Sequence, residues 1–133
     1  MRSIMKIAKE CRKWAEEQVP DGWPDNLCGL CGHASLQLFL SLQKEGYHPG
    51  LAMCWCHCFI VIDGYRLDIT ATQFDVYYDE VHYEPHIKDG ETPYYYKEDK
   101  IVYEIWEVME IVSDFHYPGL EIGEQSCLLQ VNK

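Results

Sequence analysis

Near the start of the chain, apolar residues recur at every third or fourth position, which is the spacing of an amphipathic helix. In residues 3–18 these positions are Ile4, Ile7, Ala8, Cys11, Trp14 and Ala15, with lysines and glutamates on the other side. Ser3 is placed to cap this helix, and Pro20-Asp21-Gly22 ends it. Residues 31–45 are apolar on most sides, which predicts a second, buried helix with Gly46 at its end.

Strand-like patterns follow. Residues 51–62 and 65–70 each predict a strand, and the Asp63-Gly64 pair between them is a strong signal for a two-residue hairpin turn. A weaker pattern at 74–83 predicts another strand. Residues 94–112 are rich in aromatic and β-branched side chains, which favours strands, but the apolar spacing of their second half also fits a helix.

The remaining segments carry turn and edge signals. Residues 85–93 predict a loop, residues 116–119 a turn, and residues 128–131 a last edge strand. With 133 residues, the chain has the length of one domain, residues 1–133. The elements together predict an α+β fold in which the helix from residue 31 packs on a central antiparallel sheet.

The charge balance is acidic, with 22 Asp and Glu against 11 Lys and Arg and a formal net charge of −11. This charge disfavours nucleic acid and anionic membranes as partners. No apolar run approaches the roughly 20 residues that span a bilayer, and residues 1–19 lack the apolar region of a signal peptide. We therefore expect a cytoplasmic protein.

Seven cysteines are many for this length, and their odd number argues against a complete disulfide framework. Core thiols, a metal site and a nucleophile remain as interpretations. Cys28-x-x-Cys31 has the spacing of zinc ligands, and Cys54, Cys56, Cys58, His33 and His57 offer further ligands. Two clean pairs of cysteine ligands are absent, so zinc is the weaker alternative, and no cofactor is expected.

Cys31 is the candidate nucleophile because it stands at the predicted start of a helix. The helix dipole and free N–H groups there favour the thiolate, which is the reactive form. Gly29 and Gly32 are expected to let the backbone pass close to the sulfur and leave room for a substrate carbonyl. The alternative is a buried core cysteine.

His57 and Asp68 are the expected partners of this thiol. A two-residue loop at Asp63-Gly64 pairs Ile62 with Tyr65 and makes Asp68 the diagonal neighbour of His57 on one face of the sheet. Asp68 can then orient His57 as the base that activates the thiol. Strand alternation places the side chains of Cys54, Cys56 and Cys58 on the opposite face as core residues. A purely structural His–Asp pair remains the alternative.

With these residues, the chain resembles the papain-like and transglutaminase-like superfamily of thiol enzymes over roughly residues 23–75. Cys28-Gly-Leu-Cys31-Gly-His-Ala-Ser35 is similar to the papain nucleophile motif, and the segment from His57 to Gly64 is similar to its histidine strand. The segment from Asp68 to Phe74 resembles the strand of transglutaminases and of bacterial and phage papain-fold glutamine deamidases. The resemblance implies a nucleophile-bearing helix packed on an antiparallel sheet, and attack on a carboxamide or ester carbonyl through a thioester.

The resemblance is incomplete before the nucleophile, where papain-type enzymes have a glutamine and this chain has Asp25. Asn26 is therefore the candidate oxyanion donor, together with the backbone N–H of Cys31. Trp23 and Trp55 are candidates to wall a substrate groove, and Gln73 is a candidate to line the site.

The sequence predicts a thiol-dependent enzyme that hydrolyses an amide or isopeptide bond of a protein or peptide through Cys31, His57 and Asp68. The resemblance favours a bacterial or phage-encoded peptidase or glutamine deamidase in the host cytoplasm. Transfer to an amine, as in a transglutaminase or acyltransferase, is one alternative. The other is a non-catalytic protein-binding module on the same fold.

Overall fold

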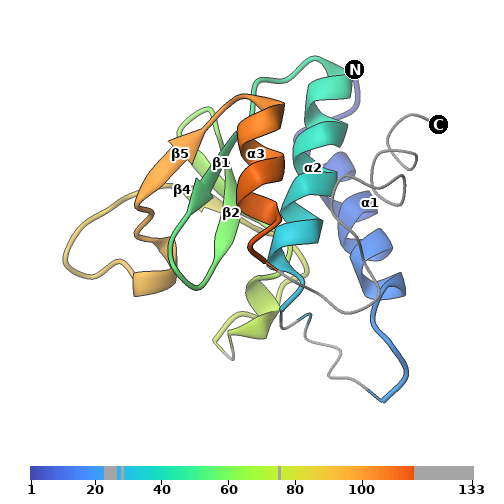
Figure 1. Cartoon of the computed structure of the whole chain (residues 1–133), viewed down its shortest axis with the longest axis horizontal. Helices are drawn as coiled ribbons and strands as arrows, with labels where there is room; N and C mark the ends of the chain where they lie inside the picture. The colour runs from blue at the N-terminus through green and yellow to red at the C-terminus, as the bar shows by residue number, and fades with distance from the viewer. Residues whose placement is uncertain (23–26, 28, 75, 116–133) are drawn as a thin grey trace.

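The computed structural model describes residues 1–22, 27, 29–74 and 76–115, and in this part of the chain three α-helices and a five-stranded antiparallel sheet form an α+β fold (Figure 1). The sheet has the strand order β4-β3-β2-β1-β5. Its strands are β1 (Gly50–Met53), β2 (Cys58–Ile62), β3 (Tyr65–Asp68), β4 (His82–Pro85) and β5 (Lys100–Val102).

Both predicted helices are confirmed. Helix α1 (Ile4–Glu17) begins after Ser3, whose hydroxyl oxygen accepts the backbone N–H of Lys6 at 3.1 Å. Helix α2 (Cys31–Glu45) begins at the candidate nucleophile and ends at Gly46. Gly46 has a φ of 104°, in the left-handed region that glycine adopts without strain. In the described residues, no helix has the length and apolarity that crossing a membrane requires.

The hairpin that joins β2 to β3 has the predicted turn and register. Asp63 and Gly64 both have positive φ, 53° and 79°, as a two-residue turn of this twist requires. Ile62 pairs with Tyr65 and Ile60 with Leu67. This register carries the end of β3, with Asp68, toward the start of β2, next to His57.

The prediction of one strand over residues 51–62 is wrong. The segment is a hairpin of β1 and β2 that turns at Trp55 and Cys56, and the N–H of Cys54 donates to the carbonyl of His57 at 2.9 Å. This turn contains none of the Gly, Asn or Asp residues that usually mark a tight hairpin, so the apolar run continues through it. Cys54, Cys56 and Cys58 therefore do not share one strand face.

One other expectation is corrected, and one open choice is resolved. The strand predicted at 74–83 lies later, in β4, and a short 3₁₀ helix η1 (Ala71–Gln73) precedes it. Residues 94–112 contain the 3₁₀ helix η2 (Tyr94–Tyr96), β5 and helix α3 (Ile105–Val112) in succession. The choice between strands and a helix is thus resolved, because the segment contains both. The turn at 116–119 and the strand at 128–131 lie outside the described residues.

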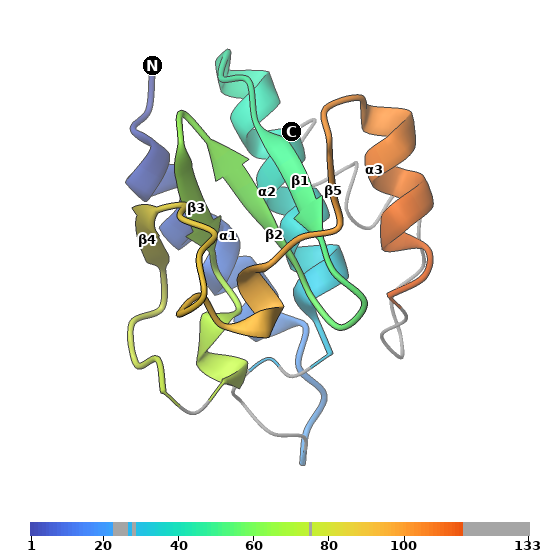
Figure 2. The same ribbon diagram turned by 90° about the vertical axis from the view of Figure 1, so that its left-hand side faces the viewer.

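The two faces of the sheet are covered differently (Figure 2). Helices α1 and α2 pack on one face, where Leu51, Ile60 and Leu67 join the main core, and α3 packs beside α2. Segment η2 lies over the other face, where Tyr95 and Tyr96 enclose a smaller core with Phe59 and Val61. The candidate site lies where these two layers meet at the end of the sheet.

Candidate active site

His57 and Asp68 are in direct contact. Nε2 of His57 lies 2.7 Å from Oδ2 of Asp68, and both side chains are buried. His57 immediately precedes β2 and Asp68 ends β3, so the short hairpin at Asp63-Gly64 fixes their separation. The carboxylate holds one ring nitrogen, which leaves the other, Nδ1, for further partners.

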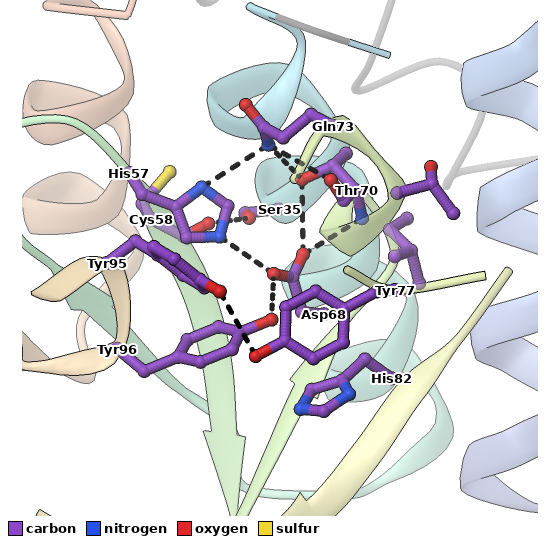
Figure 3. A network of polar contacts seen from close by, with 12 residues as sticks. Ser35, His57, Cys58, Asp68, Thr70, Gln73, Tyr77, His82, Tyr95 and Tyr96 are labelled. Atoms are coloured by element: carbon purple, nitrogen blue, oxygen red, sulfur yellow. Dashed lines mark hydrogen bonds and ion pairs between the residues drawn. The ribbon is translucent and has the colours of Figure 1, made fainter. Parts of the chain in front are cut away.

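Asp68 accepts hydrogen bonds on both of its oxygens (Figure 3). Oδ1 accepts the backbone N–H of Thr70 at 2.9 Å and its hydroxyl at 3.1 Å, and Oδ2 accepts the hydroxyl of Tyr96 at 2.7 Å. Burial alone would raise the pKa of Asp68, but the charge and hydrogen bond of His57, with the bonds from Thr70 and Tyr96, lower it. The carboxylate therefore stays ionised although it is buried.

Four aromatic rings enclose the His57 imidazole. Phe59 stacks on it at 5.8 Å between ring centroids, and Phe74, Tyr95 and Tyr96 meet it edge-on at 5.0, 6.5 and 5.9 Å. This enclosure excludes water from the His57–Asp68 pair and restricts rotation of the ring.

Cys31 completes the constellation from the helical side of the sheet. Its sulfur is in hydrogen-bonding contact with the Cys58 thiol and with the His57 ring. The hydrogen bond of Cys58 first, and then the hydrogen bond and charge of His57, outweigh burial and lower the pKa of Cys31 to about 5. Burial would lower the pKa of His57, but the charge and hydrogen bond of Asp68, with those of Cys31, raise it to about 10. Both shifts favour a thiolate–imidazolium pair at neutral pH.

A cleft of about 540 Å³ opens onto this thiol. The cleft is lined by Gly29, Cys31, Met53, Cys54, Trp55, Cys56, Gln73, Asp114 and Phe115. Only 3% of the Cys31 surface is exposed, so its sulfur lies at the base, whereas 81% of Trp55 is exposed at the rim. Trp55 stacks on Tyr94, which is also exposed, with 6.4 Å between ring centroids. Among the described residues that line the cleft, Asp114 is the one carboxylate, and most of the others are apolar.

The start of α2 is held by a close contact with Phe115, in the segment that follows α3. A Cβ atom added at Gly32 would lie 2.5 Å from Cβ of Phe115, which is closer than real Cβ atoms approach. The expectation that Gly32 leaves room for a substrate carbonyl is thus corrected, because Phe115 fills that space. Gly29, with a φ of 87°, adopts the left-handed conformation in the loop before Cys31.

The cysteines of the β1–β2 hairpin differ from the prediction. Cys54 and Cys58 are buried, but Cys56 is half-buried at the turn and lines the cleft. Cys11, Cys31, Cys54, Cys56 and Cys58 all carry free thiols. Among the described residues, no three His, Cys, Asp or Glu side chains are arranged to hold a metal ion. Cys28, which the zinc interpretation needs, lies outside them, as do Trp23 and Asn26, the candidate oxyanion donor.

Tyr96 is a hydrogen-bond partner of Asp68 that sequence reasoning missed. It belongs to a run of three tyrosines, Tyr94 to Tyr96, and that run was its only signal. Gln73 was considered only as a residue that lines the site, but its side-chain amide also contacts Thr70 and the His57 ring. Its Nε2 donates to the carbonyl of Thr70 at 3.0 Å and lies 3.5 Å from Nδ1 of His57. Figure 3 shows the His57 ring held between Gln73 and Asp68.

Comparisons with family models, curated proteins and solved structures give no match for this chain. A thiol, an imidazole and a carboxylate come from three separate elements and form a connected, buried chain that ends at an open cleft.

Proposed function

We propose that the protein is a thiol-dependent hydrolase of amide bonds in proteins or peptides, with Cys31 as nucleophile, His57 as acid and base, and Asp68 as the group that orients His57. The observation that carries this proposal is the connected chain from the Cys31 thiol through the His57 ring to the Asp68 carboxylate, 2.7 Å from the ring. A helix that begins at the nucleophile and packs on an antiparallel sheet supports a papain-like or transglutaminase-like core.

The reaction begins from the ion pair. The Cys31 thiolate attacks the carbonyl carbon, and the imidazolium of His57 then gives its proton to the departing amine or ammonia. This leaves a thioester on Cys31 and a neutral His57. Neutral His57 takes a proton from water as the water attacks the thioester, and the acid product leaves with the thiolate restored. Asp68 stabilises the charged form of His57 in both steps.

The start of α2 supplies the charge stabilisation that this reaction requires. The first N–H groups of a helix have no partner within the helix, and they concentrate positive potential at its start. Cys31 is the first residue of α2, so its backbone N–H is available to the developing oxyanion. The same potential supports the thiolate before attack.

The lining of the cleft indicates which kind of side chain the substrate carries next to the reacting carbonyl. Met53, Trp55 and Phe115 offer apolar surface beside Cys31. An apolar side chain adjacent to the carboxamide would cover part of Trp55 and gain the free energy of burying that surface. A peptide or protein segment fits this open cleft better than a fully enclosed small molecule does.

An electrophilic amide-mimic probe, followed by peptide mapping, tests the nucleophile directly. We expect labelling of Cys31 at neutral pH, its loss in Cys31→Ala and strong reduction in His57→Ala. His48→Ala removes an exposed histidine far from the chain of contacts and should label like the unmodified protein. Slow and equal labelling of all the cysteines would reject the enzyme and favour the protein-binding module.

The reaction type is tested on glutamine-containing peptides. Release of ammonia indicates deamidation, new peptide termini indicate peptidase activity, and incorporation of an added primary amine indicates transfer. We expect ammonia or new termini without amine incorporation. If the unmodified protein releases no more ammonia and no more new termini than Cys31→Ala does, on protein and peptide substrates alike, hydrolysis is contradicted.

A further inference from the structure

Cys58 is a buried thiol that the proposed reaction does not use. It is the first residue of β2 and is fully buried, and its side chain faces the core between the sheet and α2. Its thiol donates a hydrogen bond to the sulfur of Cys31. Two cysteine sulfurs that lie in direct contact, one of them a thiolate, form a pair that oxidation can join.

The backbone around this pair is fixed from both elements. The hydroxyl of Ser35, one turn after Cys31, donates to the carbonyl of Cys58 at 3.3 Å. This bond ties the first turn of α2 to the start of β2, so the two cysteines come from segments that are held next to one another. Cys31 lines the open cleft, and a small oxidant can therefore reach its sulfur without passing through the core.

We propose that Cys31 and Cys58 form a reversible disulfide after oxidation of Cys31 by a hydroperoxide, and that this disulfide protects the nucleophile from irreversible oxidation. The two sulfurs must close from hydrogen-bonding contact to a bond of about 2.05 Å. That approach is the structural change that the proposal requires.

In the first step, the thiolate sulfur of Cys31 attacks one oxygen of the hydroperoxide and breaks the O–O bond. The sulfur is oxidised by two electrons to a sulfenic acid, and the peroxide is reduced to hydroxide or alkoxide, which leaves as water or alcohol after taking a proton from the His57 imidazolium. The buried acid that serves amide hydrolysis thus also serves this step.

In the second step, Cys58 gives up its proton and its sulfur attacks the sulfur of the sulfenic acid. The S–O bond breaks, the departing hydroxide takes up the proton that Cys58 lost and leaves as water, and the disulfide forms. Burial raises the pKa of Cys58 well above its usual value, and the hydrogen bond to Cys31 and the charge of Cys31 raise it further. Conversion of the thiolate to a neutral sulfenic acid removes the charge of Cys31, so Cys58 becomes easier to deprotonate when it is needed.

The other two thiols of the hairpin are less suited to this role. The sulfurs of Cys54 and Cys56 lie 3.7 Å apart and contact each other, and Cys54 also contacts the carbonyls of His57 and Tyr95. Cys58 is the main hydrogen-bond partner of the Cys31 thiolate, whereas Cys56 is affected by the charge of Cys31. A Cys54–Cys56 or Cys31–Cys56 disulfide that forms in place of a Cys31–Cys58 disulfide would contradict the proposal.

The test is a mapping experiment on the full chain, and it requires no substrate. The reduced protein is treated with a few equivalents of hydrogen peroxide, its free thiols are blocked in denaturant, and the disulfide peptides are identified by mass spectrometry without reduction. Fragmentation of the linked peptides assigns the sulfurs. We expect a Cys31–Cys58 disulfide that a dithiol reductant removes, with recovery of Cys31 labelling by the amide-mimic probe.

Variants separate the possible partners. The disulfide should persist in Cys56→Ser and in Cys11→Ser, which removes a buried thiol of α1 outside the cleft. Cys58→Ser and Cys58→Ala should lack it and should accumulate sulfinic acid on Cys31, with loss of reductant recovery. A thermal unfolding measurement first establishes that each variant is folded.

Two results would overturn the proposal. One is a disulfide of Cys31 with a cysteine other than Cys58, and the other is oxidation of Cys31 to sulfinic acid in the unmodified protein with no disulfide. Because the readout is a peptide mass, it does not depend on any amide reaction. A protein without amidase activity can still form the disulfide, and an active enzyme can fail to form it.

Discussion

The hydroxyl of Tyr96 donates to Oδ2 of Asp68 at 2.7 Å, the same carboxylate oxygen that contacts Nε2 of His57. Tyr96 comes from η2, on the face of the sheet opposite α2, so the site is closed from both sides of the sheet. The guanidinium of Arg66 lies 4.4 Å from the centre of the Tyr96 ring. The His82 ring stacks on the Tyr96 ring with 5.3 Å between their centroids. The position of this phenol is therefore set by packing on two sides.

Tyr96→Phe removes this hydrogen bond and leaves the ring packing intact. We expect a loss of about 2 kcal/mol in the free energy of unfolding, because a buried carboxylate loses one of its donors. Amide hydrolysis should fall as well, since Oδ2 then bonds His57 alone and the ring is held less firmly. Denaturant unfolding and steady-state kinetics measure both effects. Tyr103→Phe, at an exposed tyrosine, is the control, and an equal effect there would contradict the role of Tyr96.

Asp68→Asn tests the charge of the carboxylate while preserving its shape. Asp68 is the main cause of the raised pKa of His57, which is about 10, so its neutralisation should lower that pKa. The imidazolium is then lost at lower pH, and the alkaline limb of the pH–rate profile should move toward neutral pH. The rate at neutral pH should fall on the order of 10²–10⁴-fold. An alkaline limb that stays in place would reject Asp68 as the partner of His57.

Alkylation of Cys31 should show a distinctive pH dependence. Its pKa of about 5 means that the thiolate predominates above that pH, so the alkylation rate should be flat near neutrality and fall about tenfold per pH unit below 5. Burial raises the pKa of Cys11 and of Cys56 to about 11, so both should react only in alkaline solution. Iodoacetamide labelling across pH, followed by peptide mapping, distinguishes these classes.

The same measurement shows what holds the thiolate. His57→Ala and Cys58→Ala each remove a hydrogen-bond partner that lowers the pKa of Cys31, so the midpoint should move upward from pH 5 in both. His48→Ala should leave it in place. A midpoint that is unchanged in both variants would show that the helix start alone stabilises the thiolate.

The α1 and α2 helices and the β2–β3 hairpin were predictable because each depends on local chemistry. Ser3 caps α1, Gly46 ends α2, and Asp63-Gly64 allows a single tight turn whose length sets the register. The approach of Asp68 to His57 follows from that register. These parts of the site could therefore be placed from the sequence.

The other parts of the site depend on contacts between residues that are far apart in the sequence. Tyr96 reaches Asp68 across 28 positions because η2 crosses the sheet face, and no local pattern encodes that crossing. The hairpin at Trp55 and Cys56 lacks turn residues, so alternation was wrongly extended through it. As a result, Cys56 was assigned to the core although it lines the cleft, and the contact between Cys31 and Cys58 was not foreseen.

Gly32→Ala tests how the start of α2 is held in place. The added Cβ would lie 2.5 Å from Cβ of Phe115, so α2 and the segment that follows α3 must separate. We expect a loss of about 1–3 kcal/mol in the free energy of unfolding, and lower reactivity of Cys31, the neighbouring residue. Gly90→Ala is the matched control, because nothing lies within 4 Å of the added atom there. Equal stability of both variants, measured by denaturant unfolding, would contradict the close packing.

Trp55→Ala tests whether the apolar rim of the cleft binds substrate. Because 81% of Trp55 is exposed, its removal should change the free energy of unfolding little. For peptides with a large apolar residue beside the reacting amide, we expect KM to rise about tenfold, or about 1.4 kcal/mol, with kcat nearly unchanged because Trp55 does not touch the reacting atoms. For peptides with glycine there, the change should be small. Trp106→Ala removes a similarly exposed tryptophan (64%) on α3, outside the lining of the cleft, and should behave like the unmodified protein. If both variants raise KM equally, or if the effect of Trp55→Ala is the same for both classes of peptide, the cleft does not select substrates through this rim.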